Sequence, residues 1–141
     1  TLQLANALAD YDSYFYEEPI RPEHIPAWSQ LRSQIQVPLA TGECLYTRFE
    51  FLDLITQKGA DIIQPDVCVC GGLLEMKKIA AIGEAHYVPI ALHNPMGLLA
   101  TAVNLHFALY QLRISRFWNR LMSPIYPKVV TWKCVTDLVW K

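Results

Sequence analysis

The 141-residue sequence lacks the features that would place it at a membrane or on a nucleic acid. Its longest apolar stretch, residues 98–112, is interrupted by polar side chains and falls short of the roughly 20 residues that span a bilayer. Twelve Lys and Arg balance thirteen Asp and Glu for a net charge of −1, and the sequence has no basic run that would follow a phosphate backbone. The first residues carry neither the basic segment nor the apolar core of a signal peptide. We therefore expect a soluble cytoplasmic protein with no membrane or nucleic-acid partner.

The sequence also lacks paired cysteines. Of Cys44, Cys68, Cys70 and Cys134, only Cys68 and Cys70 are close to each other in the chain. A structural zinc site usually has two pairs of ligands, with the members of each pair two to four residues apart. We therefore expect reduced, partly buried thiols rather than metal ligands or disulfides.

Apolar residues, by contrast, are plentiful, and the hydrophobic fraction of 52% is ample for a core. Helical spacing of apolar residues alternates with short apolar runs, which is typical of a parallel α/β fold with about four βα units. A complete eight-stranded barrel needs about 250 residues, so we expect only part of a TIM-like barrel. The predicted helices are residues 2–13, 23–35, 48–57, 73–86 and 98–110, and the predicted strands are 14–16, 37–41, 61–64 and 88–92.

Each predicted strand leads into a side chain that can bind metal or move a proton. These side chains are Glu17, Glu43, Asp66 and His93, at intervals of 26, 23 and 27 residues. Each interval accommodates one strand, one helix and two loops. The active site of a parallel α/β barrel lies at the C-terminal ends of its strands, so we expect the four side chains at one edge of the sheet.

Glu17 and Glu43 are predicted at neighbouring strand ends, where two carboxylates repel each other. A divalent cation relieves this repulsion, and hard oxygen ligands favour Mg²⁺. Either glutamate alone could equally be a solvated loop residue or a helix cap. The pair in register favours a magnesium site.

Asp66 and His93 form a second predicted pair at adjacent strand ends. A carboxylate beside an imidazole fixes the tautomer of the ring and makes it an effective general base near neutral pH. Either residue alone would more simply be a turn cap or a satisfied loop histidine. The other histidines, His24, His86 and His106, fit such structural positions better.

The strings around these residues resemble a known family. E-E-P, G-E-C-L-Y-T-R, D-I-I-Q-P-D followed by G-G, and A-L-H-N-P-M-G are similar to motifs of the mandelate racemase branch of the enolase superfamily. The similarity is greatest to sugar-acid dehydratases of the galactonate dehydratase type, and it covers about residues 1–108. It implies a C-terminal (β/α)7β barrel domain.

The resemblance also implies roles for the four residues. Glu17 and Glu43 would be two of three Mg²⁺ ligands, His93 would remove the α-proton of a sugar acid, and Asp66 would increase the basicity of His93. Loss of the β-hydroxyl would then give a 2-keto-3-deoxy sugar acid. Arg48 and Asn94 could contact substrate hydroxyls, although solvent-facing roles suit them equally well.

The resemblance further implies that a third metal ligand, an upstream acid and a capping domain are not part of this sequence. We therefore expect no turnover by the chain alone, and homo-oligomers among full-length relatives. Two alternatives remain. The reaction could be a racemisation or cycloisomerisation within the same superfamily, or the chain could be a silent module that binds partners through exposed barrel edges.

Residues 111–141 do not follow the pattern of residues 1–110. They carry several Arg and Trp residues but have neither helical nor strand periodicity. A reading frame shifted within the Tyr110 codon permits, with suitable codons, an apolar strand ending in Glu and then an acidic Gly-Gly turn. The family places such a strand there, so we predict an atypical tail produced by a frameshift.

Overall fold

A computed structural model describes residues 2–11 and 13–114. The chain divides into two compact units, Thr1–Leu105 and His106–Lys141, and the second is described only as far as residue 114. Except for the last residues of the fifth helix, the tail predicted at 111–141 lies outside the described residues. The frameshift and the domain boundary near residue 110 therefore stay predictions.

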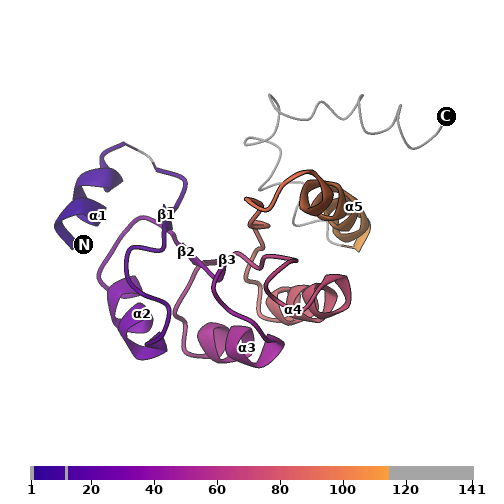
Figure 1. Cartoon of the computed structure of the whole chain (residues 1–141). Coiled ribbons are helices and arrows are strands. Elements are labelled where there is room, and N and C mark those ends of the chain that lie inside the picture. Colours follow the sequence, from indigo (N-terminus) through magenta and orange to yellow (C-terminus); the bar gives the residue numbers. More distant parts are fainter. Residues whose placement is uncertain (1, 12, 115–141) are drawn as a thin grey trace. The chain divides into compact units, whose positions relative to one another are not determined.

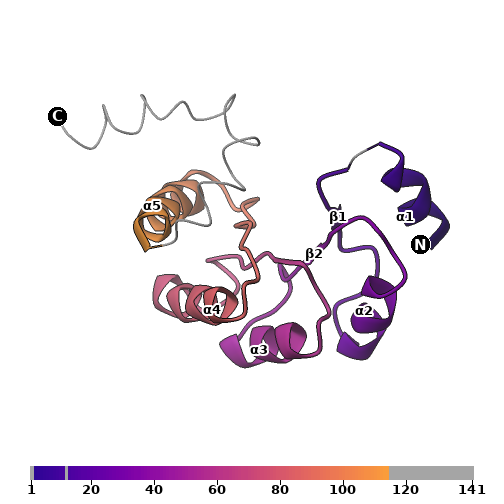
Figure 2. The ribbon, with the colours of Figure 1, turned by 180° about the vertical axis from the view of Figure 1, so that it is seen from behind.

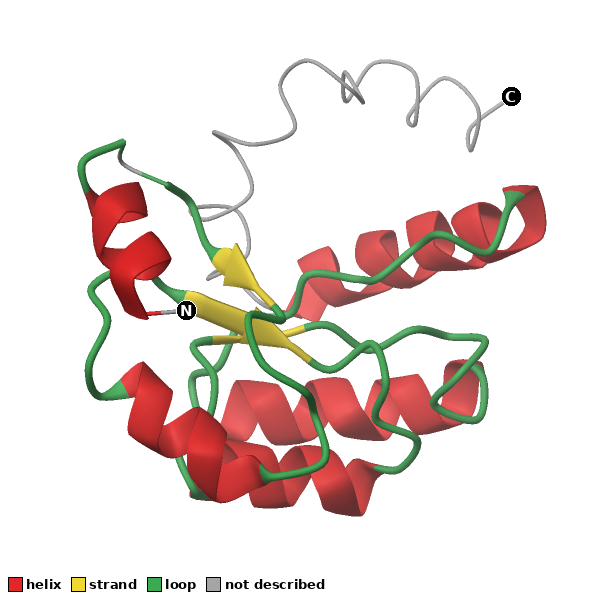
Figure 3. Cartoon of the chain, turned by 60° about the vertical axis from the view of Figure 1, so that its left-hand side comes forward, coloured by secondary structure: helices red, strands yellow, loops and turns green. Residues whose placement is uncertain are grey.

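The described part of the chain alternates strands and helices in the predicted order. Its three strands form one sheet in the order β1-β2-β3, and all of them are parallel (Figures 1 and 3). This arrangement confirms the prediction of a partial parallel α/β barrel. The helices are α1 (Leu2–Ala9), α2 (Ile25–Arg32), α3 (Arg48–Thr56), α4 (Leu73–Ala85) and α5 (Leu98–Ile114), and the strands are β1 (Tyr16–Glu17), β2 (Leu39–Thr41) and β3 (Ile62–Ile63).

The fourth predicted strand differs from the other three. It lies beside β3 in the parallel direction, but it pairs only at two isolated bridges, Ile63 with Ile90 and Asp66 with His93. Around Ile63 the ladder is intact, since the Ile63 N–H donates to the Pro89 carbonyl and the Ala91 N–H donates to the Ile63 carbonyl, both at 3.0 Å. Pro65 lies between the two bridges and has no N–H to donate, so the ladder is interrupted there. The Pro65 carbonyl still accepts from the His93 N–H at 3.2 Å, and the second bridge aligns Asp66 with His93.

The core lies between the sheet and the helices that follow its strands. The central strand β2 is buried along its whole length. Helices α2, α3 and α4 succeed one another along the sheet in both opposite views (Figures 1 and 2). Each helix contributes a side chain that is 1% exposed or less, namely Trp28 from α2, Phe51 from α3 and Met76 from α4.

Two residues that follow α3 determine how the helix ends. Lys58, not Gly59, takes the left-handed φ of 55° after the last turn. Gly59 is needed for space instead, because a Cβ there would lie 2.7 Å from Leu54 Cδ1 and 3.3 Å from Trp28 Cβ. The close approach of α2 and α3 therefore depends on this glycine.

Helix α5 begins at Leu98 as predicted and continues to Ile114, four residues beyond the predicted end. Among the helices that the structure describes, none combines the length and apolar character needed to cross a membrane.

Of the cysteines in the described ranges, Cys44 and Cys68 are exposed, Cys70 is buried, and all three are free thiols. Cys134 lies outside those ranges.

Candidate active site

His93 lies between two carboxylates that come from different strand ends. Its Nδ1 is 3.0 Å from Asp66 Oδ2, and its Nε2 is 2.9 Å from Glu43 Oε2. Three of the four predicted site residues are therefore in direct contact. The parallel register of the strands explains the contact, because it brings strand ends that are far apart in sequence to one edge.

Asp66 is held firmly beneath the imidazole. It is only 1% exposed, and its Oδ1 accepts a hydrogen bond from the Cys68 N–H at 2.7 Å. Its backbone carbonyl accepts from Val69 and Cys70, which closes a tight turn. Because an ionised carboxylate only accepts hydrogen bonds, its contact with Nδ1 places a proton on Nδ1 and directs Nε2 away from Asp66.

The contacts of His93 involve both ring nitrogens. With a carboxylate at hydrogen-bond distance from each ring nitrogen, the geometry suits a ring that donates from both nitrogens. That is the state a general base reaches after it has accepted a proton. The backbone of His93 is fixed as well, since its carbonyl accepts from Asn104 Nδ2 at 3.2 Å.

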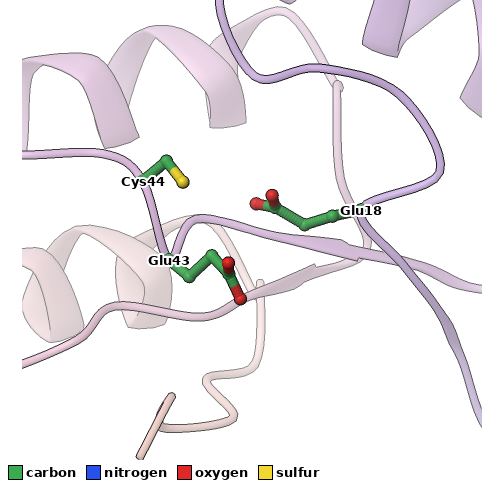
Figure 4. A group of neighbouring side chains, drawn as sticks. All are labelled: Glu18, Glu43 and Cys44. Carbon is green, nitrogen blue, oxygen red and sulfur yellow. The ribbon is translucent and has the colours of Figure 1, made fainter. Parts of the chain in front are cut away.

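Glu43 is also part of an acidic cluster with Glu18 and Cys44. Each residue offers one ligand atom, and all three atoms lie within 4.8 Å of one another (Figure 4). Glu18 Oε1 accepts hydrogen bonds from Thr41 Oγ1 at 2.7 Å and from the Gly42 N–H at 3.2 Å. Glu18 thereby ties the loop after β1 to the residues that lead into Glu43.

Glu17, the first glutamate of the E-E-P string, has a different partner. Its Oε1 accepts a hydrogen bond from Gln64 Nε2 at 2.5 Å. Within the described residues, Glu17 belongs to no group of three potential metal ligands. The pairing of Glu17 with Glu43 at a cation therefore stays a prediction. Sequence reasoning overlooked Glu18, although the double glutamate offered both carboxylates.

The pKa of the Cys44 thiol is shifted by its burial and by the surrounding acidic cluster. Its pKa is raised by burial and then by the negative charges of Glu18, Glu43 and Glu23. In the absence of a cation the thiol is therefore protonated at neutral pH. Glu18 and Glu43 offer carboxylate oxygens, which suit hard cations.

Two residues considered for substrate hydroxyls are engaged within the protein. Arg48 Nη1 lies 2.9 and 2.8 Å from the two carboxylate oxygens of Glu75. Asn94 Nδ2 donates to Thr101 Oγ1 at 3.0 Å. The first contact joins the start of α3 to the start of α4, and the second joins the loop after His93 to α5. The remaining histidines, His24, His86 and His106, are exposed.

Known proteins with named activities resemble this chain. A D-galactonate dehydratase from Ralstonia nicotianae is 40% identical over 103 residues, which is 73% of this chain and 27% of that protein. A crystal structure of a protein from Agrobacterium radiobacter is 61% identical in sequence and superposes with a TM-score of 0.73. The match covers 74% of this chain and 27% of the Agrobacterium radiobacter chain. It is described as an enolase with galactarate dehydratase as candidate activity, bound to Na and L-malate.

A third relative has a different reaction. The 3,6-anhydro-D-galactonate cycloisomerase from Zobellia galactanivorans is 33% identical in sequence and superposes with a TM-score of 0.73. The match covers 76% of this chain and 30% of the cycloisomerase chain. This chain thus spans between a quarter and a third of the length of these relatives. The pattern of the family described as enolase C-terminal domain-like matches residues 1–123. The parallel fold, the site at its strand ends and these similarities together show that the chain belongs to the enolase C-terminal domain-like family.

Proposed function

We propose that this chain carries the proton-abstracting edge of a Mg²⁺-dependent sugar-acid dehydratase, a hydro-lyase. The observation that supports it most is the position of His93, with Asp66 at 3.0 Å on one ring nitrogen and Glu43 at 2.9 Å on the other. Relatives named as galactonate or galactarate dehydratases support the reaction class. A general base next to a potential metal ligand is the arrangement that removal of a proton α to a carboxylate requires.

His93 and Asp66 would carry out the proton transfer. Asp66 holds the proton on Nδ1, so Nε2 is the nitrogen that accepts the α-proton. Asp66 also stabilises the positive charge of the ring after transfer. Because Asp66 is anchored by the Cys68 N–H and His93 by Asn104, little reorganisation is needed at the moment of reaction.

The donor set at the acidic end suits a divalent cation. Glu17, Glu18 and Glu43 supply only carboxylate oxygens, the ligand type that Mg²⁺ prefers. We assign Glu17 and Glu43 as ligands from this chain, with Glu18 positioning the loop beneath Glu43. When bound, Mg²⁺ would polarise the substrate carboxylate and stabilise the charge that develops as the α-proton leaves.

The proposed substrates are galactonate, gluconate or similar polyhydroxylated acids. The relatives named for galactonate and for galactarate both act, by name, on a six-carbon sugar acid. Loss of the β-hydroxyl would complete the reaction. The chain alone is expected to show no turnover, and a cytoplasmic location and a homo-oligomeric full-length protein belong to the same proposal.

The experiment replaces the aligned segment of the Agrobacterium radiobacter protein with residues 2–110 of this chain. We expect this hybrid to exchange the α-proton of a sugar acid with solvent deuterium, as followed by proton NMR. His93→Asn should lower the exchange rate by about 10²- to 10⁴-fold, the usual contribution of a general base. The control is His86→Asn, an exposed histidine at the end of α4, which should leave exchange unchanged. Normal exchange in the His93 variant would rule out this assignment.

Cycloisomerisation is the second candidate, because the Zobellia galactanivorans relative carries that name. Both reactions begin with proton abstraction, so the exchange experiment does not separate them. The mass of the product does, since dehydration lowers the mass of the acid by one water and isomerisation leaves it unchanged. A silent interaction module would show neither exchange nor product in the hybrid.

A further inference from the structure

Gln64 is a buried polar residue for which the proposed proton transfer has no use. It lies in the D-I-I-Q-P-D string between β3 and Asp66, and it is only 4% exposed. Its backbone N–H donates to the Thr41 carbonyl at 2.9 Å, which continues the parallel ladder between β2 and β3. The position of its side chain is therefore fixed by the sheet.

The side chain of Gln64 reaches across β2 to the end of β1. Its Nε2 donates to Glu17 Oε1 at 2.5 Å, and the amide must face this way because a carboxylate can only accept. The other end of the same amide, Oε1, is buried and has no hydrogen-bond partner within the described residues. Buried unpaired acceptors are rare, so one at this edge requires a reason.

We propose that Gln64 is a positioning residue that orients the Glu17 carboxylate toward a divalent cation. The proposal rests on the proposed function, because it takes Glu17 as a metal ligand. Glu43 is held by His93 and Glu18 by the Thr41–Gly42 turn, whereas Glu17 is exposed and its carboxylate is held by Gln64. Because Glu17 Oε1 accepts the hydrogen bond from the Gln64 amide, Glu17 Oε2 is the oxygen directed to the metal. Partners of this kind usually change metal affinity about 10- to 100-fold.

The test measures Mn²⁺ binding to the 141-residue chain by electron paramagnetic resonance. Gln64→Met keeps the length of the side chain but removes the donor, and it should raise the Mn²⁺ dissociation constant about 10- to 100-fold. The matched control is Gln57→Met. Gln57 also donates its Nε2 to a carboxylate, Asp53 Oδ1 at 2.7 Å, but it lies on the exposed end of α3 and should have no effect.

A second measurement covers the case in which Gln64→Met fails to fold. In the unsubstituted chain, Mn²⁺ should broaden the side-chain amide NMR signals of Gln64 before those of Gln57. Glu17→Gln, a change at an exposed residue, should shift the Gln64 signals even without metal. The shift in Glu17→Gln shows only that the hydrogen bond exists in solution, whereas a Gln64 amide remote from the cation predicts no preferential broadening by Mn²⁺.

The outcomes separate this proposal from the one on which it rests. Unchanged Mn²⁺ affinity in a folded Gln64→Met, or Gln64 signals that Mn²⁺ does not broaden before those of Gln57, would overturn the role of Gln64 alone. If the chain binds no Mn²⁺, or if Glu43→Gln binds it equally well, the metal assignment itself is wrong and the role of Gln64 falls with it.

Discussion

The two halves of the candidate site are built in different ways. Asp66, in the half that carries His93, is 1% exposed and is held by a backbone N–H and a ring nitrogen. Glu43, in the acidic half, has a side chain that is 33% exposed and is shared between His93 and the cluster with Glu18. The fold alone therefore fixes the base and its partner. The carboxylates of the acidic half are instead arranged like ligands, whose final geometry depends on what they bind.

The largest expected effect comes from removing the buried carboxylate. Asp66→Ala leaves the Cys68 N–H and the His93 ring without their acceptor, and should lower the free energy of unfolding by about 2 to 4 kcal/mol. Glu43→Ala removes a more exposed carboxylate and should cost about 1 kcal/mol or less. Urea unfolding of both variants measures the difference. Equal costs would show that the two halves are not built differently.

A smaller effect is expected at the glycine that precedes Glu43. Gly42 has a φ of 135°, and a Cβ there would lie 2.7 Å from Phe51 Cε1 and 3.0 Å from the Gln64 backbone nitrogen. Gly72 also has a positive φ, of 89°, but a Cβ there meets nothing within 4 Å. Gly42→Ala should therefore destabilise the chain by about 1 to 3 kcal/mol more than Gly72→Ala, because only the former is overpacked.

Thermal or urea unfolding of the two alanine variants checks this expectation. The comparison isolates crowding, since both changes carry the cost of a positive φ. A result in which Gly72→Ala is the more damaging would mean that the loop into Glu43 tolerates displacement. The acidic half would then be looser than the contacts of Gly42 indicate.

A weaker effect is expected where Asn104 of α5 contacts the backbone of His93. Asn104→Ala removes the hydrogen bond to the His93 carbonyl and should cost about 1 kcal/mol. The cost is limited because Asn104 Oδ1 is itself buried and without a partner within the described ranges. Asn94→Ala, at an exposed position, should change stability by less than about 0.5 kcal/mol. Unfolding curves for both variants test the contrast.

Much of the fold could be predicted from the sequence. Apolar periodicity located all five helices of residues 2–11 and 13–114, and the starts of α3, α4 and α5 match the prediction to the residue. Strand extents were overestimated because apolar side chains continue where the ladder does not. The segment before His93 shows this most clearly, since its pairing is interrupted where it faces Pro65, although its own apolar pattern continues.

The candidate site was only partly predictable. Asp66 and His93 end adjacent strands, and the parallel register does bring them together. The contact of His93 with Glu43 spans two strands, and spacing alone does not specify it. The partner of Glu17 was not foreseen either, because Gln64 reads as an ordinary residue of a strand end. Side-chain direction at a loop depends on backbone turns that apolar patterns do not encode.

The smallest expected effect concerns a carboxylate at the edge of the site that takes no part in either half. Burial tends to raise the pKa of Glu75, but the hydrogen bonds and positive charges of Lys78 and Arg48 outweigh it and hold the pKa below the ordinary 4.5. A folded-state pKa below the unfolded value stabilises the fold above about pH 4.5, and this contribution is lost as pH falls through the lower pKa. Glu75→Gln should therefore be slightly less stable than the unsubstituted chain at pH 7, and the difference should disappear at acid pH. Urea unfolding across this range tests the prediction, and a difference that grows on acidification would contradict it.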